Sequence, residues 1–186
     1  IGRAVLRSAV GFWFFLIPCP ASAAVFDGDP SNYLDLLKGL SAGDTLILRP
    51  GEYKAGLPVH GLNGEKDRPI VISGPEEGPR PLFVARTGRN TISIVDSSHV
   101  TIRNLELDGR ALPVDGVKAE GDSRWAHHVT LENLTIRGHG RDQQTVGIST
   151  KCPAWGWVIR GNEIVGAGTG LYLGNSDENA PLVGGL

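Results

Sequence analysis

A repeat that is written three times constrains the fold of this chain more than any other feature of its sequence. The segment 99–109 reads HVTIRNLELDG, and the segment 128–138 reads HVTLENLTIRG. A looser third copy covers 157–166, and the equivalent apolar positions of the three copies are Ile102, Leu131 and Ile159. These positions follow one another at intervals of 29 and 28 residues. Repeats of this length are typical of solenoids, in which each copy packs only against its neighbours.

Each copy has the alternation of a β-strand, interrupted by one bend. Apolar and polar residues alternate along the first copy as far as Asn104, where two polar residues follow each other and the alternation shifts by one residue. Asparagine tolerates the left-handed backbone conformation that a sharp bend requires, and Gly161 occupies the equivalent position of the third copy. We therefore predict two short strands that meet at a corner.

A second repeated segment predicts a third strand in each copy. It covers 115–120, 146–151 and 169–174, and in each case a glycine directly precedes the first apolar residue. Ile148 and Leu171 are 23 residues apart, and so are Ile94 and Val117. This equal interval predicts that the strand with Ile94 is the same strand of the preceding copy, with Ile94 beside Val117. Three strands per copy, all running in the same direction, predict an all-β fold, the parallel β-helix.

The segment 1–23 differs from the rest and predicts a signal peptide. Arg3 and Arg7 precede an apolar run from Ala9 to Ile17, and a small-residue segment ends at Ala23. We expect cleavage near this point and a secreted or periplasmic product. An uncleaved membrane anchor is the alternative, although the run is shorter than a spanning helix, and lipidation at Cys19 is a further one.

Charge and cysteine content exclude two classes of protein. Loss of Arg3 and Arg7 with the signal peptide takes the net charge from −2 to −4, which is unsuited to nucleic acid binding. Of the two cysteines, Cys19 leaves with the signal, so Cys152 has no partner in the chain. A disulfide framework is therefore excluded.

A short helix is predicted in the segment 24–42, before the first coil. It runs from Ser31 to Leu40, with Ser31 as its N-cap and Leu34 and Leu37 on one face. Its position suits a cap over the open end of the solenoid, where exposed strand edges would otherwise pair with another chain.

Two segments resemble a known family. They are 43–53, GDTLILRPGEY, which ends in a Pro-Gly turn, and 63–74, NGEKDRPIVISG. Both are similar to the opening coils of secreted right-handed parallel β-helix proteins of the pectate-lyase-like superfamily, nearest the alginate lyase and chondroitinase B group. The resemblance covers 43–186 and implies a polysaccharide ligand and, in some members, Ca²⁺. A further corner strand is due near position 187, so we expect the later coils to be missing.

Outward residues of the third strand predict a groove for a sugar chain. The glycines at 116, 147 and 170 are expected to leave a bare strip on this face, bordered by loops at 121–126 and 139–144. Aromatic faces stack on sugar rings, and cations pair with uronate carboxylates. The predicted substrate-binding residues are Lys118, Glu120, Trp125, Lys151 and Tyr172. The alternative is a flat exposed sheet with a structural Glu120–Lys151 pair.

Catalytic residues are not assigned by the sequence. Elimination from a uronic acid needs a cation for the carboxylate, a base for the C5 proton and an acid for the leaving oxygen. Lys118 or Lys151 could act as the base and Arg137 or Arg141 as the clamp. No pattern matches the family's catalytic set, so no catalytic role is transferred.

No metal site is predicted from the histidines. His127 and His128 are consecutive on a strand and are expected to point to opposite faces, which prevents them from sharing an ion. His139 could form an acid–base couple with Asp142, although the glycines around them favour a solvated loop.

Taken together, the sequence predicts an exported protein that binds or cleaves an acidic polysaccharide, with polysaccharide-lyase-like β-elimination as the reaction. The alternatives are a carbohydrate-binding or adhesin β-helix without catalysis and a purely structural repeat module. Oligomeric state and the identity of the sugar stay open.

Overall fold

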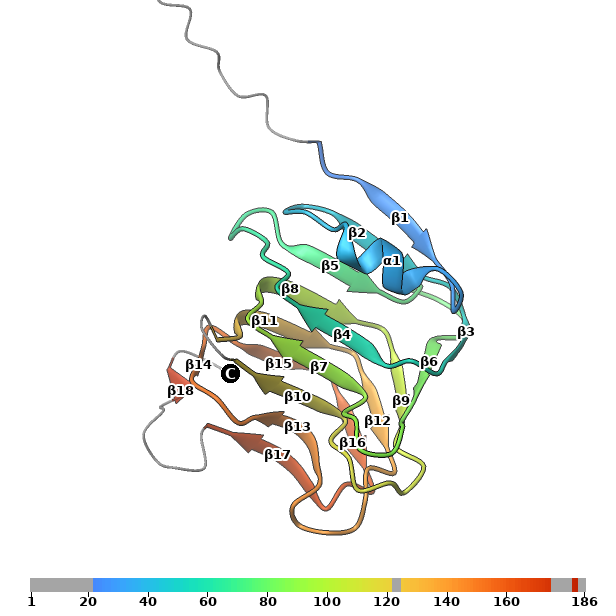
Figure 1. Cartoon of the computed structure of the whole chain (residues 1–186), viewed down its shortest axis with the longest axis vertical. Coiled ribbons are helices and arrows are strands. Elements are labelled where there is room, and N and C mark those ends of the chain that lie inside the picture. Colours follow the sequence, from blue (N-terminus) through green and yellow to red (C-terminus); the bar gives the residue numbers. More distant parts are fainter. Residues whose placement is uncertain (1–21, 122–124, 175–181, 184–186) are drawn as a thin grey trace, which may run out of the picture.

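The computed structural model describes residues 22–121, 125–174 and, for the backbone only, 182–183. Three parallel sheets form the walls of a solenoid (Figure 1). Sheet A contains, in spatial order, β1 (Val25–Gly28), β2 (Thr45–Leu48), β5 (Ile70–Ser73), β8 (Ser98–Arg103), β11 (His127–Glu132) and β15 (Val158–Arg160).

The other two sheets contribute one strand each to every coil. Sheet B contains β3 (Gly51–Tyr53), β6 (Pro81–Val84), β9 (Glu106–Asp108), β12 (Thr135–Arg137) and β16 (Glu163–Val165). Sheet C contains β4 (Leu57–His60), β7 (Ile92–Val95), β10 (Val117–Glu120), β13 (Val146–Thr150) and β17 (Thr169–Leu173). A small extra pair is formed by β14 (Ala154–Trp155) and β18 (Leu182–Val183).

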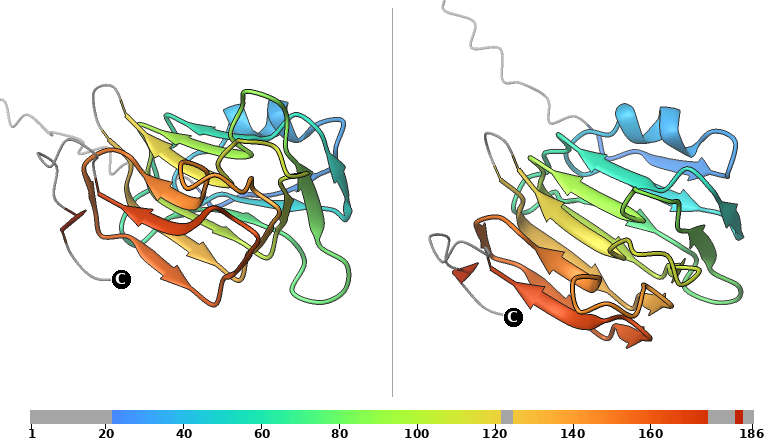
Figure 2. Two further views of the ribbon diagram at one scale, coloured as in Figure 1. Left: turned by 90° about the horizontal axis from the view of Figure 1, so that it is seen from below. Right: turned by 60° about the horizontal axis from the view of Figure 1, so that its bottom comes forward.

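The chain passes from sheet A to sheet B to sheet C in every coil, and all the pairings between these strands are parallel. The two views of Figure 2 show the coils stacked along one axis. The predicted right-handed parallel β-helix with three strands per coil is therefore confirmed.

The predicted superposition of the repeats is also confirmed. Leu131 pairs with both Ile102 and Ile159, and Ile148 pairs with both Val117 and Leu171. The predicted pairing of Val117 with Ile94 was wrong by two residues. Val117 pairs with Ile92, and the expected partner Ile94 lies beside Ala119. The intervals between strands of sheet C vary because the loops between them differ in length.

The bend between sheets A and B has the conformation expected from the repeat. The backbone φ angles of Asn104, Asn133 and Gly161 are 57°, 53° and 63°, all in the left-handed region. The asparagine side chains also stack, because Asn133 Nδ2 donates to Asn104 Oδ1 at 2.7 Å. The corner thus combines a backbone requirement with a hydrogen bond between coils.

The core is a set of aliphatic rows inside the three sheets, with aromatic rings at its N-terminal end. Leu46, Ile72, Ile102 and Leu131 have no exposed surface. Tyr33, Tyr53 and Phe83 are also buried and pack against one another, with ring centroids 4.7 to 6.0 Å apart. Each coil can bury these side chains only against adjacent coils.

The N-terminal cap differs in detail from the prediction. The helix α1 (Tyr33–Lys38) is shorter than 31–40, and its N-cap is Asn32, without a side-chain capping bond. Ser31 instead donates its hydroxyl to Asp29 Oδ1 at 2.6 Å. β1 precedes the helix and extends sheet A, and the buried Tyr33 donates to the Gly56 carbonyl oxygen at 2.6 Å. Figure 1 shows α1 at the end of the solenoid.

Two predictions concern segments that the structure does not cover. Most of the proposed signal peptide, 1–21, lies outside the described residues, as does part of the last predicted coil. Among the described residues, no helix is long and apolar enough to cross a membrane.

Candidate functional site

The outward face of sheet C carries the residues predicted to bind substrate. Alternation places buried Val117 and Ile148 inside and Lys118 on the outer side, whereas its neighbour Ser149 is fully buried. The strand register aligns one row across all five strands, which consists of Pro58, Ser93, Lys118, Ser149 and Tyr172. In Figure 1 these strands follow one another down the molecule.

Lys118 and Glu120 form an ion pair on this face. The Lys118 Nζ lies 2.5 Å from the Glu120 Oε1, and the side chains are 23% and 44% exposed. The alternative pair of Glu120 with Lys151 is therefore not the one formed. Because Glu120 already neutralises Lys118, the free positive charge of this face must come from other residues.

A depression of about 270 Å³ lies at the end of sheet C nearer the N-terminus, beside Glu120. Its polar lining includes His60, Ser93, Arg86 and Arg89. His60 Nε2 lies 2.9 Å from Ser93 Oγ. Burial lowers the pKa of His60, against a smaller opposing effect of the nearby Glu120 carboxylate, so the imidazole is neutral at pH 7.

A second depression of about 380 Å³ lies at the other end of the same sheet. Lys151 and Tyr172 line it together with Gln143, Gln144, Val146 and Thr169. The structure thus brings Lys151 and Tyr172 to one hollow and Glu120 to the other, while Lys118 lines neither depression. This outward face with both depressions is called the sheet C face below.

Three cations of the sheet C face form no ion pair with any described residue. They are the exposed Arg86 and Arg89, on the loop between β6 and β7, and the half-buried Lys151. The two arginines were missed by sequence reasoning because they precede the repeated segments. The correct register of Ser93 with Lys118 would have pointed to this loop.

Trp125 lies at the corner between β10 and β11 and not in either depression. Its ring packs partly against the hydrophobic core, and its backbone N–H donates to Asp96 Oδ1 at 3.1 Å. Only the exposed part of the ring is available to a ligand. Its predicted role in substrate binding stays a prediction.

The glycine column does not form the expected bare strip. A Cβ on Gly116 would lie 2.8 Å from Ile136 Cγ2, and one on Gly147 would lie 2.6 Å from Ile164 Cγ2. Both glycines therefore point toward sheet B across the interior. They are needed because the backbone approaches the core side chains closely at this corner.

The other candidates for chemistry are dispersed. Arg137 lies on sheet B and pairs with Glu163 at 3.1 Å, and Arg141 lines a separate hollow beside Gly140. His139 is fully buried, which excludes the solvated loop and a couple with the exposed Asp142. Asp122, in the loop 121–126 predicted to border the groove, lies outside the described residues.

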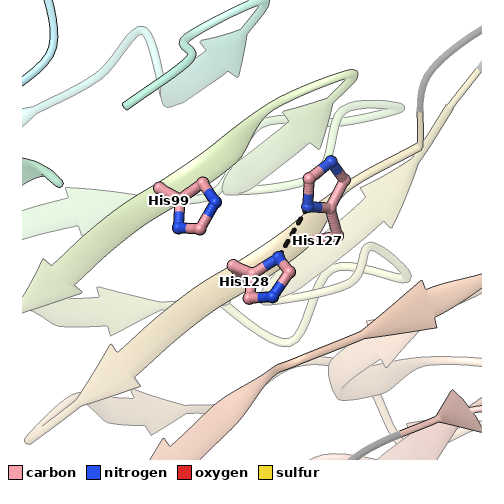
Figure 3. Close-up of side chains that lie close together, drawn as sticks. All are labelled: His99, His127 and His128. Atoms are coloured by element: carbon pink, nitrogen blue, oxygen red, sulfur yellow. Dashed lines mark hydrogen bonds between the residues drawn. The ribbon is translucent and has the colours of Figure 1, made fainter. Parts of the chain in front are cut away.

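The three histidines at the start of β8 and β11 lie together, contrary to the prediction (Figure 3). The φ angle of His128 is 51°, so its ring does not follow strand alternation and lies on the same side as His127. The His127 and His128 Nδ1 atoms are 2.8 Å apart. Burial, together with the neighbouring His128, lowers the pKa values of His99 and His127.

The described residues do not fit a calcium site. Ca²⁺ takes six to eight oxygen ligands, mostly carboxylates and carbonyls. Within the described residues, the group of three or more potential side-chain ligands that converges is the histidine cluster, which offers nitrogen only. No step is therefore assigned to Ca²⁺.

Comparison with known proteins identifies the fold. No protein-family model matches the chain, and no curated protein matches its sequence. Among solved structures, the GH136 lacto-N-biosidase from Eubacterium ramulus superposes with a TM-score of 0.61 at 14% identity over 80% of this chain. A mutant of the PL6 family alginate lyase AlyGC superposes with a TM-score of 0.60 at 16% identity over 75%. The chain shares the three-sheet parallel β-helix fold of these proteins.

This β-helix spans only part of the proteins that it matches. It covers 36% of the lacto-N-biosidase chain and 19% of the alginate lyase chain. At these identities the likeness concerns the fold, and the function must be argued from the β-helix's own residues.

Proposed function

We propose that this β-helix binds an acidic polysaccharide along the sheet C face. The observation that carries the proposal is the set of three cations without an ion-pair partner among the described residues, Arg86, Arg89 and Lys151. They flank a flat row of strands on which equivalent residues recur at each coil, about 4.8 Å apart. A linear polymer with repeated carboxylates matches such a row better than a compact ligand does.

The chemistry of each group suits a uronate chain. An arginine can bind a carboxylate through two parallel hydrogen bonds, which gives both affinity and orientation. Tyr172 offers a partly exposed ring for contact with a sugar, and Ser93 and Glu120 can exchange hydrogen bonds with hydroxyl groups. The depressions at the two ends of the face supply the concave surface that ligand sites usually have. Export of the protein, as expected from the segment 1–23, would place it where such polymers occur.

A direct test compares two double variants of equal charge change. Arg86→Gln with Arg89→Gln removes two of the three cations without an ion-pair partner, whereas Lys38→Gln with Lys54→Gln removes two exposed lysines that pair with Asp35 and Glu52. Charge-assisted hydrogen bonds are worth about 1.5–3 kcal/mol each. We expect the first variant to bind alginate or pectate at least tenfold more weakly and the second to bind like the parent. Equal affinities for all three proteins would overturn the proposal.

A second candidate function is β-elimination at the first depression, favoured by the neutral His60 beside the two arginines. The arginines would neutralise the uronate carboxylate, and His60 would accept the C5 proton as the C4–C5 double bond forms and the C4–O bond breaks. The protonated His60 or a water molecule would then give a proton to the leaving oxygen. Incubation with alginate, pectate and chondroitin, followed by absorbance of the unsaturated product, tests this reaction. We expect His60→Gln to abolish turnover while changing binding less than about threefold, well under the effect of one charged hydrogen bond. Binding without product on any substrate would assign the β-helix to the non-catalytic class.

A further inference from the structure

We propose that His99, His127 and His128 form a binding site for a transition-metal ion of the zinc class, near the N-terminal ends of two neighbouring strands of sheet A. One ligand atom of each ring lies within 4.8 Å of the ligand atoms of the other two. The cluster joins two successive coils, because His99 belongs to β8 and the other two belong to β11 (Figure 3). It lies on a different sheet from the proposed polysaccharide face and does not depend on that function.

The repeat itself brings two of the rings together. His99 and His128 occupy the same position of successive copies, and both have a φ angle of 51°. The register of β8 and β11 sets them side by side, and their rings stack at a centroid distance of 4.4 Å and an interplanar angle of 14°. The stacking brings one ligand nitrogen of each ring within 4.8 Å of the other, and rotation of the side chains directs both lone pairs at one ion.

The third ring is held in place by its own partners. His127 stacks on Trp155 with centroids 4.3 Å apart and an angle of 11°. The Nδ1 atom of His127 also lies 2.8 Å from the Nδ1 atom of His128. Packing against an indole limits the rotation of the imidazole, which reduces the entropy lost when a ligand binds.

Space around the cluster is kept by a glycine. A Cβ on Gly156 would lie 2.6 Å from Cδ2 of His128, so that any larger residue would displace this ring. The hollow beside the cluster has a volume of about 400 Å³ and includes Thr101 and Thr130. Lys66 also lines it, so the local charge disfavours a cation that lacks strong ligands. An ion must therefore gain its affinity from the three nitrogens.

Ligand chemistry determines the class of ion. Imidazole nitrogen suits Zn²⁺, Cu²⁺, Ni²⁺ and Co²⁺, whereas Mg²⁺ and Ca²⁺ prefer oxygen. Zinc–nitrogen bonds of about 2.0–2.1 Å in tetrahedral geometry place the nitrogens about 3.4 Å apart. Side-chain rotation would have to bring the three nitrogens from their present arrangement, within 4.8 Å of one another, to this spacing. Three protein ligands leave the fourth position open to water or to a ligand.

Titration of the tag-free protein with ZnCl₂ in a calorimeter tests the site. We expect saturable binding of one Zn²⁺ per chain, and CaCl₂ and MgCl₂ to give none. Co²⁺ bound in the same place should show the visible absorption of a tetrahedral cobalt centre. Absence of one-to-one zinc binding, or equal binding of Ca²⁺, would overturn the proposal.

The variants are chosen to keep the fold. His127→Phe retains the ring that stacks on Trp155, and His99→Asn and His128→Asn retain a residue that tolerates the left-handed backbone. We expect each single variant to bind Zn²⁺ at least tenfold more weakly and the triple variant to show no binding. His60→Gln, which removes a histidine on sheet C, should bind like the parent. Undiminished binding by the folded triple variant would refute the site.

A measurement on the parent protein avoids dependence on the variants. X-ray absorption at the zinc edge should show scattering from three imidazole rings. A first shell made of oxygen or sulfur, the latter from Cys152, would also refute the site.

Discussion

His139 shows how one buried residue can control the pH dependence of stability. Its ring is fully buried, and Nδ1–H donates to the Val114 carbonyl oxygen at 3.1 Å. Nε2 has no hydrogen-bond partner among the described residues. Burial lowers the pKa of His139, against weaker opposing effects of Val114, Asp108 and Asp115. The folded protein therefore holds a neutral imidazole.

This arrangement predicts loss of stability in mild acid. The folded-state pKa lies below the unfolded value of about 6.5, so the free energy of unfolding is highest above pH 6.5 and falls as pH decreases. One proton changes it by at most about 1.4 kcal/mol per pH unit. His139→Asn, which keeps a donor toward Val114, should reduce the slope of melting temperature against pH between 8 and 5. An unchanged slope would show that other groups control the transition.

The glycine column permits a sharper test at single residues. Gly147→Ala places a methyl group 2.6 Å from Ile164 Cγ2 and 2.7 Å from the Gly170 carbonyl oxygen. Overpacking of this kind costs about 1–3 kcal/mol. Gly170→Ala is a matched control at the equivalent position of the next coil, where a Cβ meets nothing within 4 Å. Urea unfolding should show destabilisation by the first substitution only, and equal effects would contradict the inward orientation of Gly147.

At the scale of elements, the corner between sheets A and B depends on the asparagine pair Asn104 and Asn133. Besides the bond between their side chains, Arg80 donates to both Asn133 Oδ1, at 2.9 Å, and the Asn133 carbonyl oxygen, at 3.1 Å. The third copy has Gly161 at this position, and its φ angle is also positive. Backbone conformation and hydrogen bonding can thus be separated by mutation.

Two substitutions of Asn133 distinguish these contributions. Asn133→Gly keeps the left-handed conformation and loses the side-chain hydrogen bonds, which should cost about 1–2 kcal/mol. Asn133→Ala loses the same hydrogen bonds and also holds an alanine at a φ of 53°, where its Cβ is crowded. This strain adds about 1 kcal/mol to the loss of unfolding free energy. We expect denaturant unfolding to rank the parent above the glycine variant and the glycine variant above the alanine variant. An alanine variant as stable as the glycine variant would show that the backbone term is negligible.

At the scale of the whole molecule, the proposed binding of a polysaccharide rests on how the charges are distributed over the sheets. On sheet A, Glu132 pairs with Arg160 at 3.0 Å, and on sheet B, Arg137 pairs with Glu163 at 3.1 Å. The sheet C face keeps cations without such partners among the described residues. A chain with a net charge of −2 therefore presents a locally positive surface. Such a surface steers anionic polymers toward one face.

Binding of a uronate polymer should accordingly weaken with ionic strength. The Debye length falls from about 10 Å at 0.1 M salt to about 3 Å at 1 M, which screens exposed charges. We expect the affinity for alginate or pectate to fall between these salt concentrations. The fall should be smaller for the variant that combines Arg86→Gln with Arg89→Gln. Affinity independent of salt would indicate that contacts with sugar hydroxyls dominate.

The amino-acid sequence by itself determined the coil, because burial of apolar rows repeats at a near-constant interval. Rows such as Ile102, Leu131 and Ile159 pair as the repeat predicts, and Asn104 forms the predicted bend. Four of the five predicted substrate-binding residues also lie on or beside one sheet for this reason, since strand register follows the repeat. Their role in binding stays a prediction.

Only the tertiary structure decided the features that strand alternation does not predict. The left-handed φ of His128 joins three histidines that alternation would separate, and the close approach of two coils turns Gly116 and Gly147 inward. The loop with Arg86 and Arg89 brings its cations to sheet C from outside the repeated segments. Periodicity specifies which residues are buried together and which positions recur, but the direction of a side chain that breaks strand alternation and the path of a loop depend on local contacts that apolar spacing does not encode.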